Sequence, residues 1–386
     1  MAEFLSGNDF SVHAVKQTVK GTVPATPAFD EVRRVSGRAL KNVAYTQSEE
    51  VKTNNQGVEN VADKTTYTAE IAAETTKQSI DFLISAMKSP ESANTVTASD
   101  IQFTATNITA AAGTPFSFVS AGDFIFPSGT TDNNKAYKVV TKNSDLDLVL
   151  SPAPTVEAAG GSFTVVSNRT ITAKATIYYA LQNRILDTSL GGDNTSYQTY
   201  YDNHIQTMAV EVGETGIVGN TVSFAGENLL AGEAIIAGQT DNAKDSSNVI
   251  SASNDITTFW VNDTIENCVI KSFSLELSNN SQEDDAAGCP TGYAPGQMAI
   301  SASINARNTI DNSRRWERLY QADTTQKFAV QIDHGSNEYT ILEITKGRIL
   351  EHTIPDGSNV VASSTMSVGA EEDANNETFV LTRNWV

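Results

Sequence analysis

The sequence has few cationic residues, and this scarcity argues against one class of function. Its 386 residues include 26 Lys and Arg against 46 Asp and Glu, a formal net charge of −20 at pH 7. Sequence-independent binding of a nucleic acid backbone depends on Lys and Arg side chains. The charge balance therefore argues against a DNA-binding repressor.

Long apolar runs and cysteines are scarce as well. No segment approaches the roughly 20 apolar residues that cross a bilayer. The start, MAEFLSGNDF, lacks the basic and apolar regions of a secretory signal. We therefore predict neither a membrane span nor secretion. Cys268 and Cys289 are too few for a disulfide framework, which fits folding in a reducing compartment. We expect free thiols, with oxidation outside a cell left open.

The motifs of common catalytic and metal sites are missing too. The four histidines are His13, His204, His334 and His352. None lies in an HExxH motif or a Cys/His zinc spacing, so we interpret them as isolated surface or edge-strand residues. The segment GETGIVG at 213–219 lacks phosphate-loop order and predicts a tight hairpin turn. The acidic segment 281–288 lacks the calcium-loop pattern and predicts a solvated loop. We predict no catalytic residue, metal or cofactor.

Uncharged polar residues are abundant and favour strands and loops. Hydrophobic residues make up 39% of the chain and charged residues 19%, below the roughly 45–50% and 25% of an average soluble domain. Apolar and polar residues alternate with period two at 67–73, 272–277 and 298–306, as in half-buried strands. The polar stretch 279–296 predicts a hairpin with a long tip. The predicted fold class is mainly β.

Two short amphipathic helices are predicted among the strands. Their apolar stripes are Ile80, Leu83, Ile84 and Met87 in the first, and Trp316, Leu319 and Tyr320 in the second. Pro90 gives the first helix a stop, and Asn312 or Ser313 gives the second a cap. Both helices need a sheet to pack against.

The order of turn signals predicts three domains. Residues 98–168 hold six or so short strand candidates and no helix, as expected of a small β-sandwich inserted into a loop. The remainder is long enough for two units of roughly 157 residues. We predict a first main domain at 1–97 and 169–235, and a second at 236–386.

A weak internal repeat supports two similar units. The strand-to-helix segment at 65–87 resembles the one at 296–320. A second echo links 200–228 to 260–280 followed by 299–308. Both halves are therefore expected to be β-rich and related.

These features, in this order, resemble the major tail tube protein of long-tailed bacteriophages, especially the larger kind with a small inserted β domain. The clearest stretch is 260–386, which contains IENCVIKSFSLELSNN, GQMAISASINARNTI and RRWERLYQADTTQKFAVQID. The segment IQTMAVEVGETGIVGNTVSFAGEN also looks like the family's, and residues 98–168 resemble its inserted module. The resemblance covers most of the chain and rests on patterns of residue type.

The resemblance implies β-sandwich tube domains, each with a short helix, whose sheets join side by side into a ring. Rings stack into a hollow tube in the virion, assembled in the host cytoplasm, that conducts DNA from the capsid to the host cell. Two units per chain would give a three-subunit ring with pseudo-sixfold symmetry, and a six-subunit ring is the alternative. The implied partners are further copies, a tape-measure protein, and terminator and tail-tip proteins. DNA passes through without specific binding.

In that scheme one polar strand face lines the channel, the alternative being a plain solvent-facing sheet. The residues assigned to the channel wall are Thr68, Glu70, Glu211, Ser223, Ser272, Ser274, Glu276, Ser301, Ser303 and Asn305. The tips at 46–65 and 279–296 and the N-terminal arm 1–30 are assigned to ring-to-ring contacts, with floppy loops as the alternative. The acidic tip residues concerned are Gln282, Glu283, Asp284 and Asp285.

Two other functions compete with the tube. Acidic, Thr-rich and Asn-rich sandwiches also occur in surface or secreted adhesins, although the start of this chain shows no signal peptide. An enzyme acting on carbohydrate would need paired carboxylates at a productive separation. The joint absence of catalytic motifs makes the enzyme the weaker of the two.

Overall fold

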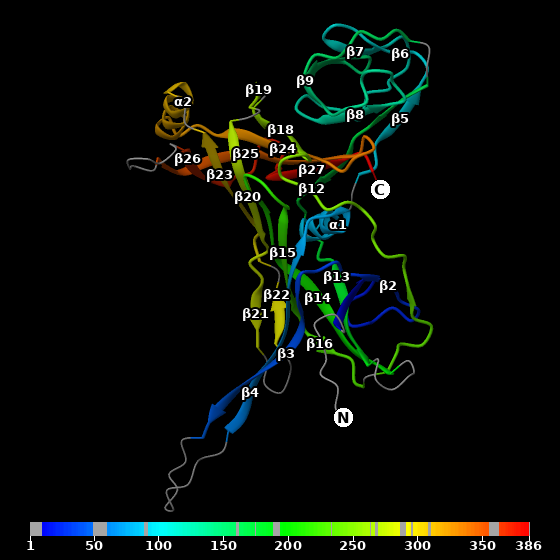
Figure 1. The fold of residues 1–386 in the computed structure, drawn as a ribbon, viewed down its shortest axis with the longest axis vertical. Coiled ribbons are helices and arrows are strands. Elements are labelled where there is room, and N and C mark those ends of the chain that lie inside the picture. The colour runs from blue at the N-terminus through cyan, green and yellow to red at the C-terminus, as the bar shows by residue number, and fades with distance from the viewer. Residues whose placement is uncertain are drawn as a thin grey trace, which may run out of the picture.

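A computed structural model gives the fold for most of the chain. It describes residues 10–48, 60–88, 92–159, 162–173, 175–187, 194–232, 234–262, 264–266, 269–285, 291–294, 296–307, 310–354 and 363–385. This part of the chain is mainly β-strand with two short α-helices, which confirms the predicted fold class. Figure 1 shows an elongated molecule with helices against its strands.

The main sheet contains the same order of elements twice. The first repeat comprises β1 (Phe10–Gln17), β3 (Ser36–Gln47), β4 (Asn60–Glu74), α1 (Lys77–Ala86), β13 (Tyr178–Asp187), β14 (Asn194–Val212), β15 (Gly219–Gly226) and β16 (Asn228–Leu229). The second repeat comprises β18 (Ile256–Val261), β20 (Ile270–Ser278), β23 (Ala299–Arg307), α2 (Ile310–Gln321), β24 (Gln326–Asp333), β25 (Tyr339–Thr353), β26 (Ser363–Ala370) and β27 (Phe379–Arg383).

Strand pairing is the same in both repeats. A hairpin, β3–β4 or β20–β23, precedes the helix, and its second strand pairs with β15 or β26. The long strand β14 or β25 pairs with β13 or β24 along its first half and with β15 or β26 along its second half. Each helix packs against the long strand of its own repeat.

One strand pair joins the two repeats. The second half of β14 also pairs with β20, from Thr207 opposite Ser278 to Val212 opposite Phe273. The sheet therefore runs without a break in the order β3–β4–β15–β14–β20–β23–β26–β25. Within the described part of the chain, its two outer edges are β3 and the second half of β25.

The register aligns the repeats residue by residue. The ladder of β14 with β15 skips Gln206, directly after Ile205, and the ladder of β25 with β26 skips Leu350, directly after Ile349. These are one-residue β-bulges at equivalent places. Likewise, α1 follows the end of β4 by the same interval as α2 follows the end of β23.

The repeat confirms one predicted echo and corrects the other. Segments 65–87 and 296–320 are β4–α1 and β23–α2, as predicted. Segment 200–228 holds β14 and β15, whose counterparts are β25 and β26, so matching it to β20 and β23 was wrong. Every half-buried hairpin shares period-two alternation, which does not say which hairpin corresponds to which. The turn between β14 and β15 confirms the hairpin predicted for GETGIVG.

A single buried apolar cluster lies under both repeats. It includes the inward side chains of the continuous sheet and of both helices. Leu83 of α1 and Trp316 of α2 occupy equivalent positions and are fully buried. The two repeats therefore share one core.

A separate seven-stranded sheet interrupts the first repeat between α1 and β13. Its strands are β5 (Thr95–Ala98), β6 (Ile101–Phe103), β7 (Asn107–Ala110), β8 (Phe124–Ser128), β9 (Tyr137–Ser144), β10 (Asp147–Ser151) and β11 (Phe163–Val166), in the order β5–β11–β8–β9–β10–β7–β6. We call residues 95–166 the insert. It has its own apolar core and lies at the opposite end of the molecule from the β3–β4 hairpin (Figure 1).

The insert packs on the second repeat although it interrupts the first. The Phe124 and Trp260 rings meet edge to face, with centroids 5.0 Å apart. The Phe126 and Tyr339 rings stack with centroids 6.1 Å apart. Lys138, fully buried, donates a hydrogen bond of 2.6 Å to the backbone carbonyl of Asn262. Removing the insert would therefore uncover apolar surface of the second repeat.

Four further short strands belong to the main sheet. They are β2 (Ala28–Glu31), β12 (Asn168–Ile171), β17 (Thr240–Asp241) and β19 (Thr264–Ile265). Residues 10–17 and 28–30 of the expected arm 1–30 are thus parts of strands of the sheet. β17 pairs with β2, and the Ile250 backbone bonds to Thr75, so residues 240–250 lie beside the first repeat. We therefore propose that the first repeat extends to near residue 255, beyond the boundary at 235 expected from the sequence.

Candidate functional surfaces

The ten residues assigned to the channel wall lie on one face of the continuous sheet. Cross-strand pairs show this: Glu70 lies opposite Ser223, and Ser274 lies opposite both Glu211 and Ser303. All ten are exposed or partly exposed, whereas the alternate residues belong to the buried cluster. We call this side of the sheet the polar face. Its ten assigned members are Thr68, Glu70, Glu211, Ser223, Ser272, Ser274, Glu276, Ser301, Ser303 and Asn305.

The chemistry of these ten side chains is weakly attractive to phosphate. Three are carboxylates and seven carry hydroxyl or amide groups. Arg38 of β3 lies opposite Glu70 and brings a cation to the same face. Since phosphate contacts depend on clustered cations, the ten residues offer a nucleic acid backbone little affinity.

Two hairpin tips extend toward the same end of the molecule. Figure 1 shows the β3–β4 hairpin and the small hairpin of β21 (Gln282–Asp284) and β22 (Gly292–Ala294) pointing in one direction. Lys64 of β4 links them: its Nζ lies 2.5 Å from Glu283 Oε2 and 3.0 Å from Asp285 Oδ2. The hydrogen bond from Lys64 holds the pKa of Asp285 below its usual value. Residues 49–59, 286–290 and 295 of the expected tips lie outside the described residues.

The outer edge of β3 is only partly blocked. The Asn183 side chain occupies both backbone groups of Ala39, donating to its carbonyl at 2.7 Å and accepting from its N–H at 3.2 Å. Backbone groups point to alternate sides along a strand, so those of Lys41 and Val43 point the same way as those of Ala39. No described strand pairs with them there.

The outer edge of β25 carries exposed apolar side chains. Leu350 is 58% exposed and Ile354 is 42% exposed. The helix beside this edge is exposed too: Tyr320 of α2 is 40% exposed, while its counterpart Met87 after α1 is fully buried. The second repeat covers the end of α1, where Asn279 Nδ2 donates to the Ala86 carbonyl at 3.3 Å. Among the described residues, the end of α2 thus lacks the cover that the second repeat gives to the end of α1.

A comparison with protein families identifies what these surfaces belong to. The sequence matches the family model described as phage tail tube protein over residues 7–373. The chain belongs to the phage tail tube protein family. No curated protein matches it.

Family membership makes this tail tube protein a structural component of the virion. The match confirms the resemblance to a phage tail tube protein seen in the sequence, and the mainly β structure agrees with it. Across the described residues, no group of three or more His, Cys, Asp or Glu is placed to hold a metal ion, and no helix is long and apolar enough to cross a membrane. Cys268 and Cys289 lie outside the described residues.

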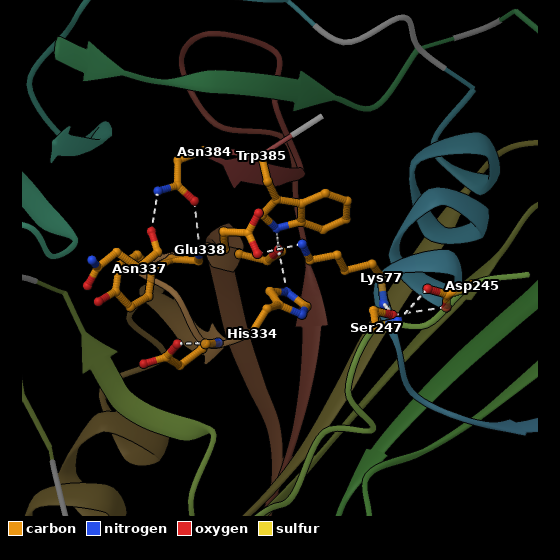
Figure 2. Close-up of polar contacts among 12 residues, drawn as sticks. Lys77, Asp245, Ser247, His334, Asn337, Glu338, Asn384 and Trp385 are labelled. Carbon is orange, nitrogen blue, oxygen red and sulfur yellow. Dashed lines mark hydrogen bonds and ion pairs between the residues drawn. The ribbon is translucent and has the colours of Figure 1, made fainter. Parts of the chain in front are cut away.

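A polar cluster links the two repeats of this tail tube protein (Figure 2). Lys77, at the start of α1, places its Nζ 2.5 Å from Glu338 Oε2 and 5.0 Å from the centre of the Trp385 ring. Trp385 Nε1 and His334 Nε2 both contact Thr340 Oγ1, at 3.2 and 3.0 Å. The first helix is thereby tied to the β24–β25 turn and the C-terminal end of the second repeat.

Three of the four histidines are buried, which corrects their interpretation as surface or edge-strand residues. His13, His204 and His334 are 6%, 5% and 8% exposed. Burial, together with nearby cations, lowers the pKa of each to about 4. An imidazole is intermediate between apolar and polar side chains, so the alternation pattern alone did not mark these positions as buried. All three are neutral near pH 7.

Proposed function

We propose that three copies of this chain form a ring and that rings stack into the tube of a long-tailed phage. The observation that carries the proposal is the β14–β20 pairing, which already joins two equivalent repeats side by side within one chain. Three chains would supply six pseudo-equivalent repeats. A closed ring also removes the sheet edges that invite uncontrolled aggregation.

We assign the polar face to the channel wall. Both helices and the buried cluster lie on the other side of the continuous sheet, so only the polar face is free to line a lumen. Its ten assigned side chains would let DNA pass from the capsid to the host cell without binding it. The net charge of −20 acts in the same direction.

The two hairpin tips are assigned to the contact between stacked rings because they extend in one direction. Glu283 and Asp285 already bind Lys64 of the same chain, and the Gln282 amide already donates to the Asn280 carbonyl. Of the four tip residues, Asp284 is therefore the side chain that we expect to contact the next ring most directly, beside Gln282. A tape-measure protein inside the tube, and terminator and tail-tip proteins at its ends, are the further partners that we propose.

Negative-stain and cryo-electron microscopy of the purified protein test this proposal, with the mass of isolated rings measured in parallel. We expect rings of three chains with six lobes, the insert outside and the polar face inside. Six chains per ring would replace the trimer by a hexamer. A map with the polar face on the exterior would overturn the channel assignment, and monomers at every concentration would overturn assembly and favour the adhesin.

A further inference from the structure

We propose that the ring closes by antiparallel pairing of the second half of β25 with β3 of the next copy, in the register of β14–β20. In this register Lys41 of the next copy completes a charged group with Glu317 and His352. The inference rests on the proposed ring, and the partner is a second copy of this chain. The internal joint between the repeats serves as the template.

The register follows from the equivalence of the strands. The bulges at Gln206 and Leu350 align the second half of β14 with that of β25. β20 and β3 are the first strands of their hairpins, and Leu275 and Ala39 occupy the same place in them, each opposite a buried alanine. The internal pairs Thr207–Ser278 and Met208–Leu277 therefore correspond to Glu351–Asn42 and His352–Lys41 at the ring contact.

The backbone groups required for this pairing are in place. At the internal joint the Asn279 N–H donates to the Gln206 carbonyl at 2.8 Å. The equivalent bond runs from the Val43 N–H of the next copy to the Leu350 carbonyl. Lys41 and Val43 have their backbone groups on the open side of β3, as described above. The ladder ends at Ala39, because Asn183 already takes both of its backbone groups.

The side chains at the ring contact differ from those of the internal joint in one informative way. Internally, the positions concerned are Ile84, Met208 and Leu277, all buried in the shared apolar cluster. Their counterparts at the outer edges are Glu317, His352 and Lys41. An apolar trio is thus replaced by an acid, an imidazole and a base.

The acid and the imidazole already form a pair that lacks its third member. The ring of His352 is buried, and its Nδ1 lies 2.8 Å from Glu317 Oε2. Its Nε2 is buried and has no hydrogen-bond partner among the described residues. The Glu317 side chain is 43% exposed. Lys41 is exposed and makes no ion pair with a described residue, so its ammonium is available to Glu317 of another copy.

Apolar contacts would accompany the charged group. In this register Leu350, 58% exposed, comes next to Val43 of the neighbouring copy. Tyr320 occupies the place of Met87, which the second repeat covers at the internal joint. The neighbouring copy would therefore bury the apolar groups that the isolated chain leaves exposed on its β25 edge.

Engineered disulfides test the register. In a background with Cys268→Ser and Cys289→Ser, we combine Glu351→Cys with Asn42→Cys, a pair without ladder hydrogen bonds and so roughly 4.5 Å apart at Cα. Oxidised rings should give covalent dimers and trimers on non-reducing gels. Thr207→Cys with Ser278→Cys is the matched control, which should cross-link within one chain. Glu351→Cys with Ala44→Cys, two residues out of register, should not cross-link.

A charge swap tests the side chains. Lys41→Glu or Glu317→Lys alone should raise the protein concentration for half-maximal ring formation tenfold or more, and the double variant should bring it back within threefold of the original. The melting temperature of the monomer checks folding in every variant. Single variants that assemble as well as the original would overturn the charged contact. Rings that cross-link only at 351 and 44 would overturn the register, whereas absence of rings in the Cys-free background would overturn the proposed function itself.

Discussion

The β14–β20 joint and the two outer edges are made from equivalent strands but carry different side chains. At the joint Met208 and Leu277 face each other in the core. At the edges the same positions hold His352 and Lys41. The joint is covered once, when the chain folds, whereas an edge must stay soluble until another copy arrives. In the proposed ring, the duplication would therefore separate a permanent contact from a reversible one with the same backbone geometry.

The largest expected effect comes from placing the side chain of the edge in the joint. Leu277→Lys puts at the joint the residue that β3 has at the equivalent position. An ammonium would then lie unpaired in the apolar cluster, so we expect the free energy of unfolding to fall by about 4 kcal/mol or more. Urea denaturation of the monomer, followed by circular dichroism, measures this loss.

The reverse change, Lys41→Leu, is the matched control. Lys41 is exposed in the single chain, so the free energy of unfolding should change by less than about 0.5 kcal/mol. The substitution makes the β3 edge more apolar, so it should instead raise the tendency of the monomer to aggregate at protein concentrations too low for ring formation. If both variants lost a similar free energy of unfolding, position 41 at the edge would be no more tolerant of substitution than position 277 at the joint, and the two contacts would not differ as proposed.

Sequence patterns predicted the parts of the fold that depend on local periodicity. Alternation located β4, β20 and β23 and the polar face, and the stripes around Leu83 and Trp316 located both helices. Alternation tells which face a residue takes but not which strand lies beside it. The pairing of β14 with β20, and hence the equivalence of Leu277 and Lys41, depends on contacts far apart in the sequence and was not predictable in this way.

The docking of the insert was also beyond sequence reasoning. The turn signals around 98–168 outlined its strands, but an insertion between α1 and β13 gives no reason to expect contact with Trp260 or Tyr339 of the other repeat. Similarly, a lone histidine in a strand pattern does not tell from sequence whether it is buried, and His204 is 5% exposed. Tertiary packing decided both.

An intermediate effect should come from the contact between the insert and the second repeat. Trp260, 1% exposed, packs on Phe124 of the insert. Trp260→Ala should lower the free energy of unfolding by about 3 kcal/mol, since it leaves a cavity between the two units. Differential scanning calorimetry measures the loss and shows whether the insert and the sheet still unfold together.

A double-mutant cycle with Phe124→Ala shows whether the loss belongs to this contact. We expect a coupling energy of at least about 0.5 kcal/mol between the two positions. Phe116→Ala, in the insert's own core, is the control and should be additive with Trp260→Ala. Additivity in both cycles would mean that the insert does not depend on the second repeat.

One buried group in each repeat, His204 and Glu343, should also respond to pH in opposite directions, and this effect is the smallest when it is expressed per pH unit. Burial, with Lys88 and Lys20 nearby, lowers the pKa of His204 in the first repeat from 6.5 to about 4. Burial raises the pKa of Glu343 in the second repeat from 4.5 to about 7, against the opposing charge of Lys138. Between pH 4 and 6.5 the unfolded chain holds more protons at His204, so the contribution of His204 to the free energy of unfolding decreases as pH falls. Between pH 4.5 and 7 the folded chain holds more protons at Glu343, so the contribution of Glu343 decreases as pH rises.

Single substitutions should therefore flatten opposite parts of the stability profile. His204→Gln should remove a slope of about 1.4 kcal/mol per pH unit between pH 6.5 and 4, because glutamine can still bond to Ser281 and does not titrate. Glu343→Gln should remove a slope of similar size and opposite sign between pH 4.5 and 7. Urea unfolding of the monomer at half-unit pH intervals gives both profiles. If His204→Gln left the stability profile between pH 4 and 6.5 unchanged, the folded and unfolded chains would bind a proton at His204 equally. Burial in the first repeat would then not lower the pKa of this imidazole.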